Sequence, residues 1–292
     1  MASRESYLSR ILETAPGLQV RSVEFNERGQ NSDIVVINGE LVFRFPKYTQ
    51  VLERLKVETA ILSAIQGRVP LPVPTPTFVS LEGRQVGAAL IGYRLIPGKP
   101  LWRELYRRIA EERTAGALAA QLGAFLKALH GLPPSEVVGC VLPLMDTYDQ
   151  CLDIYTRMRA KLFGYMRPDA RRWVTRHFEG FLGEPGNFAY EPVLKHGDFG
   201  PSNILFSEET QEICGVIDFG SSGLGDPAYD FAGLLSGYGE DLVRRCAIAY
   251  PEIESFLPRI GFYRGTFALL EALFGVENGD AQAFQAGIEQ YL

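Results

Sequence analysis

The chain has 292 residues, of which 46% are hydrophobic and 22% are charged, a composition typical of a soluble protein with a large core or two lobes. Its net charge of −6 argues against nucleic acid as a partner, because nucleic-acid-binding surfaces are usually basic. The charge is compatible with a small cationic ligand, although it is also ordinary for solubility.

No apolar run approaches the roughly 20 residues that a transmembrane helix needs. The polar start of the chain is not followed by the apolar core of an export signal. We therefore predict a cytoplasmic protein with no membrane partner. Its four cysteines are widely spaced and are expected to be reduced thiols: Cys140, Cys151, Cys214 and Cys246.

The first part of the chain predicts about five strands around one helix. A short helix is expected over 5–14, and strands rich in Val and Ile are expected over 18–25, 33–37, 40–45, 77–81 and 87–96. Asn38-Gly39 is a strong signal for a two-residue hairpin turn. The helix over 49–66 ends at Gly67, and four prolines within 70–76 impose an extended connector.

The segment Pro97-Gly98-Lys99-Pro100 interrupts the chain as a hinge, after which the pattern becomes mostly helical. Helices are predicted over 112–130, 148–164, 169–182 and much of 228–292, and short apolar strands over 193–195, 204–206 and 215–217. We therefore predict an α+β protein with a small antiparallel β lobe, residues 1–97, and a larger, mainly helical lobe, residues 98–292. A cleft between two such lobes is a usual place for a ligand.

The short strands of the second lobe carry the most informative motifs. Residues 195–203 read Lys-His-Gly-Asp-Phe-Gly-Pro-Ser-Asn, and 217–220 read Ile-Asp-Phe-Gly. A His-x-Asp-x4-Asn pattern followed by Asp-Phe-Gly matches a protein-kinase-type phosphoryl-transfer site. Asp198 is then the base that accepts the proton of the substrate hydroxyl or orients it, and Asn203 and Asp218 offer the hard oxygen ligands that Mg²⁺ prefers.

Other polar residues near these motifs have structural interpretations. His196 is expected to orient the loop as a hydrogen-bonded core histidine. Asp226 is a good N-cap, with Pro227 at the first helical position, and Asp230 is expected to brace the catalytic loop.

A cation and a carboxylate in the first lobe have the pattern that a kinase site requires. Glu58 lies on the hydrophobic face of the helix over 49–66, where a carboxylate is costly unless a cation meets it. The preceding strand offers Arg44, whose side chain points away from those of its neighbours Phe43 and Phe45. A strand cation facing a helix glutamate holds the α- and β-phosphates in kinases. The alternative is that both residues reach solvent; Lys47 is a less favoured substitute for Arg44.

The loop over 26–33 connects the first two strands and would cover the phosphates in a kinase-like lobe. It has one glycine, so it is not a Gly-x-Gly-x-x-Gly loop, but Ser32 or backbone amides nearby could bind phosphate. Most loops of this kind are simple turns. A Walker loop is excluded because Gly98-Lys99 is followed by Pro100.

Together, residues 196–203, 215–220 and 225–232 resemble the aminoglycoside phosphotransferases, which are small-molecule kinases with a bilobal protein-kinase-like fold. The strand over 43–47 and the connector over 71–74 are most similar to the subgroup that phosphorylates the 2″-hydroxyl. The resemblance covers nearly the whole chain and implies the same roles for the catalytic Asp and the magnesium ligands. It also implies that the linker Arg94-Leu95-Ile96 meets the purine of ATP or GTP through its backbone. The helical lobe would supply a substrate platform lined with carboxylates.

The sequence departs from this family pattern in three places. Arg44 stands where well-known resistance enzymes carry Lys, and a guanidinium is a rigid fork rather than a point charge. Ser221 and Ser236 stand at or near positions that are often acidic, although the ammonium groups of an aminoglycoside call for carboxylates. Glu240 and Glu271 remain as candidates for binding the substrate, together with Ser221, and each glutamate is also explained as a solvated helix charge.

These observations favour a kinase that transfers the γ-phosphate of ATP or GTP to a hydroxyl of an aminoglycoside, an activity that the resemblance links to antibiotic resistance. One alternative is the same chemistry on a macrolide, a choline-like compound or a sugar amine. Another is a nucleotide-binding regulator with little catalysis. The presence of Asp198, Asn203 and Asp218 together argues against a regulator.

Overall fold

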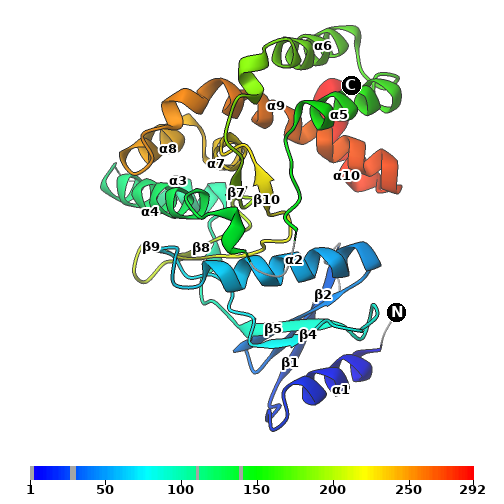
Figure 1. The fold of residues 1–292 in the computed structure, drawn as a ribbon, viewed down its shortest axis with the longest axis vertical. Helices are drawn as coiled ribbons and strands as arrows, with labels where there is room; N and C mark the ends of the chain where they lie inside the picture. The colour runs from blue at the N-terminus through cyan, green and yellow to red at the C-terminus, as the bar shows by residue number, and fades with distance from the viewer. Residues whose placement is uncertain (1–2, 27–30, 110–111, 138–140) are drawn as a thin grey trace.

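A computed structural model describes residues 3–26, 31–109, 112–137 and 141–292. It has a small β lobe and a larger helical lobe, one above the other (Figure 1). The elements of the β lobe are α1 (Arg4–Thr14), β1 (Val23–Asn26), β2 (Ser32–Ile37), β3 (Leu41–Pro46), α2 (Thr49–Ile65), β4 (Phe78–Ser80) and β5 (Leu90–Arg94). The five strands form one antiparallel sheet in the order β1-β2-β3-β5-β4.

The sheet lies between α1 and α2 because side chains alternate between the two faces of each strand. Phe43 and Phe45 are fully buried on the α1 face, where the Phe45 and Tyr7 ring centroids lie 4.2 Å apart. Val42 packs on the opposite face, with Leu52 of α2. Arg44 shares that second face, as its place between Phe43 and Phe45 predicts.

Several boundaries of the β lobe differ from the predicted ones. The strand predicted over 18–25 begins only at Val23, and the strand predicted over 87–96 begins at Leu90. The hairpin after β2 is confirmed, but Ile37 pairs with Leu41, so the loop has three residues rather than two. Its first residue, Asn38, has the positive φ of 57° that Asn tolerates better than most residues.

The helical lobe contains two further small sheets, β7-β10 and β6-β8-β9, beneath a set of helices (Figure 1). Its strands are β6 (Lys99–Pro100), β7 (Val193–Lys195), β8 (Ile204–Ser207), β9 (Glu212–Val216) and β10 (Gly223–Gly225). Its α-helices are α3 (Arg103–Ile109), α4 (Glu112–His130), α5 (Tyr148–Lys161), α6 (Pro168–Leu182), α7 (Ala228–Tyr238), α8 (Glu240–Arg245), α9 (Ile253–Asn278) and α10 (Ala281–Ile288). Short 3-10 turns occur at Pro134–Glu136, Pro185–Phe188, Cys246–Ile248 and Glu289–Tyr291.

The predicted helices over 112–130 and 169–182 and the strand over 193–195 are confirmed to within a residue. The helix predicted to reach residue 164 ends at Lys161, and the strand predicted over 215–217 is β9, over Glu212–Val216. Among the described residues, no helix combines the length and the apolar character needed to cross a membrane.

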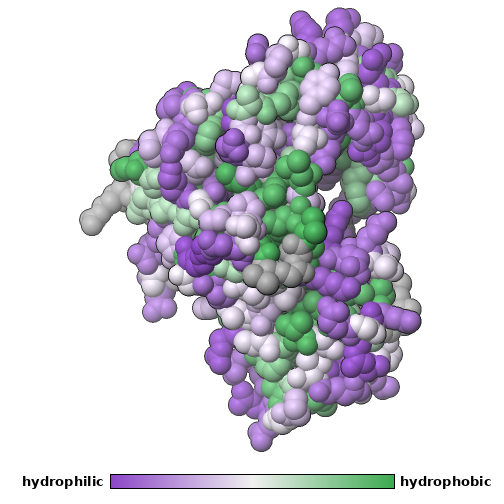
Figure 2. Space-filling model, viewed as in Figure 1, coloured by the Kyte–Doolittle hydropathy of each residue, from purple (hydrophilic) through white to green (hydrophobic). Residues whose placement is uncertain are grey.

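Helix α2 connects the two lobes. Its first half packs on the sheet, whereas Ile61, Leu62 and Ile65 lie in the hydrophobic core of the helical lobe. A hollow opens between the lobes on the face shown in Figure 2, with hydrophobic side chains on one side of it and hydrophilic ones on the other. The lobes therefore meet along a partly hollow junction that α2 spans.

The hinge between the lobes is fastened to β9. The Cys214 thiol donates a hydrogen bond to the Pro97 carbonyl at 2.9 Å. Gly98 has a φ of +140°, and a Cβ there would lie 2.3 Å from the Cys214 sulfur, so both backbone conformation and space require glycine. Cys214, Cys151 and Cys246 are free thiols, as predicted; Cys140 lies outside the described residues.

Candidate active site

The catalytic loop runs from β7 to β8 and brings Asp198 and Asn203 together. The Asn203 side-chain amide donates to the Asp198 carboxylate Oδ2 at 2.8 Å and to the Asp198 carbonyl oxygen at 2.9 Å. Asn203 is buried. The amide nitrogen therefore fixes the Asp198 carboxylate, and the amide oxygen is the atom left to bind a cation.

The electrostatic surroundings of Asp198 favour a proton acceptor. Burial raises the pKa of the Asp198 carboxyl, and the charges of Asp218 and Asp230 raise it further. His196 and the hydrogen bond from Asn203 lower the pKa, but the net direction is upward. A carboxylate whose pKa is raised binds a proton more strongly, which suits the role of a general base.

His196 and Asp230 hold the loop, as the sequence predicts. The Asp198 N–H donates to His196 Nδ1 at 3.2 Å, so Nε2 carries the proton that faces the Ile217 carbonyl oxygen at 3.0 Å. The Asp230 carboxylate accepts the N–H groups of His196 and Gly197, both at 2.8 Å. His130 Nε2 also lies 3.0 Å from Asp230.

The loop can approach the segment after the Asp-Phe-Gly motif only because residue 197 is glycine. Gly197 has a φ of +82°, and a Cβ there would lie 2.0 Å from the Ser221 carbonyl oxygen. The Ser222 hydroxyl also donates to the His196 carbonyl oxygen at 3.0 Å. The two motifs of the sequence are therefore packed directly against each other.

Arg44 and Glu58 form the predicted ion pair between strand and helix. Arg44 Nη1 lies 2.5 Å from Glu58 Oε1, and the two side chains are 12% and 2% exposed, which rules out the solvent-exposed alternative. Arg44 Nη2 also lies 3.6 Å from Asp218 Oδ1. Lys47 does not substitute for Arg44, because it pairs with Asp33 at 3.1 Å.

Burial shapes the acid–base properties of this group. Burial raises the pKa of the Glu58 carboxyl, and the neighbouring Arg44 offsets only part of that effect. For Arg44, burial alone would lower the pKa, but Glu58, Tyr93 and Asp218 together raise it. The guanidinium therefore stays charged at every accessible pH.

Asp218 and Asn203 fit a magnesium ion. Asp218 has a left-handed backbone with a φ of +63°, and its side chain is 51% exposed. Among the described residues, no cluster of three or more His, Cys, Asp or Glu could hold a metal by itself. Mg²⁺ commonly takes one or two protein oxygens and completes its shell with phosphate and water, so this donor set is sufficient.

Ser32 lies on the same face of the sheet as Arg44. Ser32 pairs with Pro46 of β3, and every second residue of a strand faces the same side, so Pro46 and Arg44 share a face with Ser32. The residue is 5% exposed, and its hydroxyl is a buried polar atom without a hydrogen-bond partner among the described residues. A buried, unpaired hydroxyl is costly unless a ligand satisfies it. Most of the predicted phosphate loop, residues 27–30, lies outside the described residues.

The linker after β5 has the backbone arrangement expected of a purine site. The Leu95 N–H donates to the Glu40 carbonyl oxygen at 2.7 Å, so Leu95 completes the pairing with β3. Backbone groups alternate in direction along an extended strand. The carbonyl of Arg94 and the N–H of Ile96 therefore point to the opposite edge.

Two cavities adjoin the catalytic loop, each of about 590 Å³. The Asp198 cavity is lined by Trp102, Arg103, Asp198, Tyr229, Ser236 and Phe267, among others. The Asp146 cavity is lined by Asp146, Asp149, Asp153, Lys195, Ser221 and Tyr229, among others. Gly197 and Tyr229 line both cavities, so the two are neighbours at the catalytic loop.

The predicted substrate residues are not brought together. Ser221 lines the Asp146 cavity. Glu240 begins α8, where it accepts a hydrogen bond from Arg244 at 2.8 Å, and Glu271 is exposed on α9. Neither glutamate lines the Asp198 or the Asp146 cavity.

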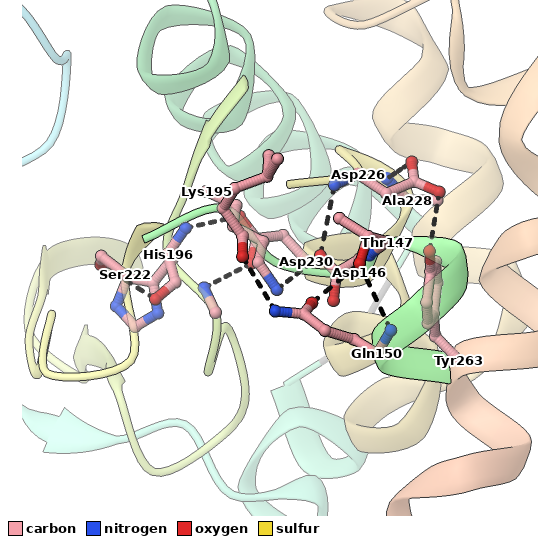
Figure 3. A network of polar contacts seen from close by, with 12 residues as sticks. Asp146, Thr147, Gln150, Lys195, His196, Ser222, Asp226, Ala228, Asp230 and Tyr263 are labelled. Carbon is pink, nitrogen blue, oxygen red and sulfur yellow. Dashed lines mark hydrogen bonds and ion pairs between the residues drawn. The ribbon is translucent and has the colours of Figure 1, made fainter. Parts of the chain in front are cut away.

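Sequence reasoning missed a buried polar network beside the catalytic loop (Figure 3). Lys195 Nζ lies 2.8 Å from Asp146 Oδ2, and Arg259 Nε lies 2.7 Å from Asp226 Oδ2. Lys195 could have been noticed, because a lysine that ends a buried apolar strand requires an acidic partner. The partner could not be found, since it lies 49 positions earlier in the chain.

The prediction for Asp226 needs a correction. Helix α7 begins at Ala228, so Pro227 precedes the helix instead of occupying its first position. Asp226 still accepts the Ala228 N–H at 2.9 Å, but its carboxylate also binds Arg259 and the Tyr263 hydroxyl. It is therefore a buried anion as well as a helix start.

Comparisons with known proteins show what the chain as a whole is similar to. Residues 22–263 match the model of the phosphotransferase enzyme family. A viomycin phosphotransferase of Streptomyces vinaceus is 30% identical over 292 residues, covering 97% of this chain and 96% of the relative. A solved GDP complex of aminoglycoside 2′-phosphotransferase-IIIa is 25% identical, with a TM-score of 0.89 over 98% of this chain and 96% of that one. A GDP and kanamycin complex of APH(2″)-IIIa is 24% identical with the same TM-score and coverage.

The chain belongs to the phosphotransferase enzyme family. The bilobal kinase-like fold predicted from the sequence is confirmed, as is the resemblance to the aminoglycoside phosphotransferases, and the chain is a small-molecule phosphotransferase. The similarity to the two solved structures extends over nearly the whole chain, so both lobes take part in it.

Proposed function

We propose that the chain transfers the γ-phosphate of ATP or GTP to a hydroxyl group of an antibiotic, either an aminoglycoside or viomycin. The observation that carries the proposal is the pair of hydrogen bonds by which Asn203 holds Asp198 at the edge of a cavity. The names of the relatives supply the acceptor classes, since these relatives act on viomycin or bind kanamycin.

The nucleotide binds between the lobes in this proposal. The carbonyl of Arg94 and the N–H of Ile96 meet the purine edge, because their backbone groups point away from β3. Arg44, held by Glu58, contacts the α- and β-phosphates, and the unpaired Ser32 hydroxyl binds a phosphate oxygen.

The transfer itself depends on orientation and charge. The Asp198 carboxylate accepts the hydroxyl proton of the acceptor as its oxygen bonds to the γ-phosphorus and the bond to the nucleoside diphosphate breaks. Asn203 Oδ1 and the Asp218 carboxylate would hold Mg²⁺. The ion, when bound, neutralises charge on the phosphate oxygens. His196 and Asp230 keep the loop in place while this happens.

The acceptor is proposed to occupy the two cavities beside the catalytic loop. Ser221 stays our proposed acceptor contact because it lines the Asp146 cavity. Glu240 and Glu271 stay predictions, and no contact in the structure supports them.

The test is a transfer assay with ATP and with GTP against kanamycin, gentamicin, viomycin, a macrolide and choline. We expect phosphate transfer to at least one of the first three, and Asp198→Ala should lower the rate roughly 10²–10⁴-fold. If phosphate were transferred only to the macrolide or to choline, the proposed acceptor class would be wrong and that compound's class would take its place. Nucleotide binding with no transfer by the wild type would leave a regulator as the better interpretation.

A further inference from the structure

Lys195 is a buried lysine that directly precedes the His-Gly-Asp motif. Its side chain is 1% exposed, and its Nζ lies 2.8 Å from Asp146 Oδ2 and 3.6 Å from the centroid of the Tyr229 ring. The phosphoryl-transfer mechanism above does not use this residue. A buried ammonium persists only where a carboxylate and an aromatic face compensate for lost water, as they do here.

The ion pair joins two segments that are distant in sequence. Asp146 lies in the segment 143–147, which is bonded to β10 through the Met145 N–H and the Leu224 carbonyl oxygen at 2.7 Å. Asp146 has a left-handed φ of +62°, and its Oδ2 accepts the Asp226 N–H at 3.2 Å. Lys195 ends β7, from which the catalytic loop begins. The pair therefore ties the 143–147 segment to the catalytic strand.

Gly225 makes room for this ion pair. A Cβ at position 225 would lie 2.3 Å from Asp146 Oδ2 and 2.9 Å from Lys195 Cε. The side chains of Asp146 and Lys195 thus pass directly over Gly225, the last residue of β10. An alanine at this position would separate the two charges without removing either.

The ion pair also changes what the Asp146 cavity offers to a ligand. Of the described residues that line this cavity, three are aspartates, and Asp146 is the least exposed of them, at 10%, whereas Asp149 and Asp153 are exposed. Lys195 neutralises Asp146, and Arg157 Nε binds Asp153 at 2.9 Å. Among the described residues that line the cavity, the least exposed carboxylate, that of Asp146, therefore already has a cationic partner and attracts an ammonium group of a ligand less strongly.

We propose that Lys195 is a positioning and specificity-determining residue of the acceptor site. Its pair with Asp146 fixes the 143–147 segment against the catalytic strand and withholds that carboxylate from the acceptor. The part of the acceptor that reaches Asp198 is then an uncharged, hydroxyl-bearing group, and cationic groups of the acceptor bind elsewhere. This inference rests on the proposed phosphotransferase function.

The test uses steady-state transfer kinetics, with the antibiotic acceptor that the wild type turns over, on variants that alter the pair in different ways. The double variant Lys195→Met/Asp146→Asn removes both charges and leaves no buried ion unpaired. Gly225→Ala keeps both charges and forces them apart. Gly180→Ala is the matched control, because a Cβ at that exposed helical position meets no atom within 4 Å.

We expect the acceptor KM to rise about tenfold or more in the double variant and in Gly225→Ala, since a small displacement of a positioning group has effects of this size. The nucleotide KM should stay at the wild-type value, and Gly180→Ala should resemble wild type in both. If the ion pair were purely structural, its removal would lower the melting temperature but would not change the acceptor KM relative to the nucleotide KM.

Wild-type kinetics in a correctly melting double variant would overturn the inference, and so would an equal change in both KM values. If the double variant does not fold, Gly225→Ala decides between the same outcomes. Transfer by the wild type to no acceptor would instead refute the proposed function, and this inference with it.

Discussion

The side chain of Asp198 shows how neighbouring groups set the chemistry of a single residue. Its pKa is raised by burial and by the charges of Asp218 and Asp230, against the opposing effects of His196 and Asn203. In the proposed mechanism only the ionised carboxylate accepts the proton of the acceptor hydroxyl, so we expect activity to require a pH above this raised pKa. The upward direction of the pKa shift therefore predicts where activity is lost as the pH falls.

We expect kcat/KM for the acceptor to fall on the acid side at a higher pH than an ordinary aspartate would produce, which is about 3.9. The loss follows from protonation of Asp198 in the free enzyme. The check is a pH–rate profile under acceptor-limiting conditions, corrected for unfolding. An acid limb at or below the ordinary value would contradict the expectation.

At Arg44, a conservative change to lysine should weaken nucleotide binding by a predictable amount. Its guanidinium contacts Glu58 with one nitrogen and approaches Asp218 with the other, and an ammonium cannot span both. We expect Arg44→Lys to fold and to raise the nucleotide KM about tenfold, the size of one lost charged hydrogen bond. The control is the reciprocal change Lys47→Arg. Lys47 directly follows β3 and forms an ion pair with Asp33, so its replacement should leave the nucleotide KM unchanged.

At the scale of elements, the hinge and the catalytic loop depend on contacts between segments. Gly98 is held against Cys214 of β9, and Asp230 of α7 binds the start of the catalytic loop. Each contact attaches an irregular segment to a regular one. The stability of these elements can therefore be tested at single positions.

Gly98→Ala should destabilise the protein by about 1–3 kcal/mol, through overpacking against the Cys214 sulfur together with an unfavourable φ. Gly83→Ala separates the two causes, because Gly83 has a φ of +64° and a Cβ there would meet no atom within 4 Å. Urea unfolding of both variants measures the difference. Equal losses would show that the close approach to sulfur contributes nothing.

Asp230→Asn should cost about 2 kcal/mol or more at neutral pH, because an amide nitrogen would face a backbone N–H in a fully buried site. Burial alone would raise the pKa of Asp230, but His130 and the neighbouring charges lower it on balance. A lowered folded-state pKa gives stability that is present above the unfolded pKa and is lost as pH falls through the lowered value. The gap between wild type and variant should therefore narrow below about pH 4. A gap that does not change with pH would contradict this linkage.

The elements that could be predicted from the sequence are those with a local pattern. The helix with Glu58 is set by hydrophobic periodicity and was predicted to within a residue, and the hydrogen bond from Asn203 to Asp198 joins residues that are only five positions apart. Strands β6 and β10 are two and three residues long and carry no periodicity to detect. The pair of Lys195 with Asp146 depends on tertiary packing, which no short window of sequence contains.

At the scale of the whole molecule, the two lobes form a kinase-like architecture that the chain shares with solved phosphotransferases over nearly its full length. The β lobe supplies Arg44 and Glu58, and the helical lobe supplies Asp198, Asn203 and Asp218. The proposed site is thus complete only when both lobes are folded and in contact.

Helix α2 makes the two lobes depend on each other thermodynamically. One end of α2 closes the core of the β lobe, and the other end, with Ile61, Leu62 and Ile65, lies in the core of the helical lobe. Neither hydrophobic core can be exposed to water without removing part of the other. Calorimetry should therefore record one cooperative heat-absorption peak, with equal calorimetric and van't Hoff enthalpies, in place of two separate transitions.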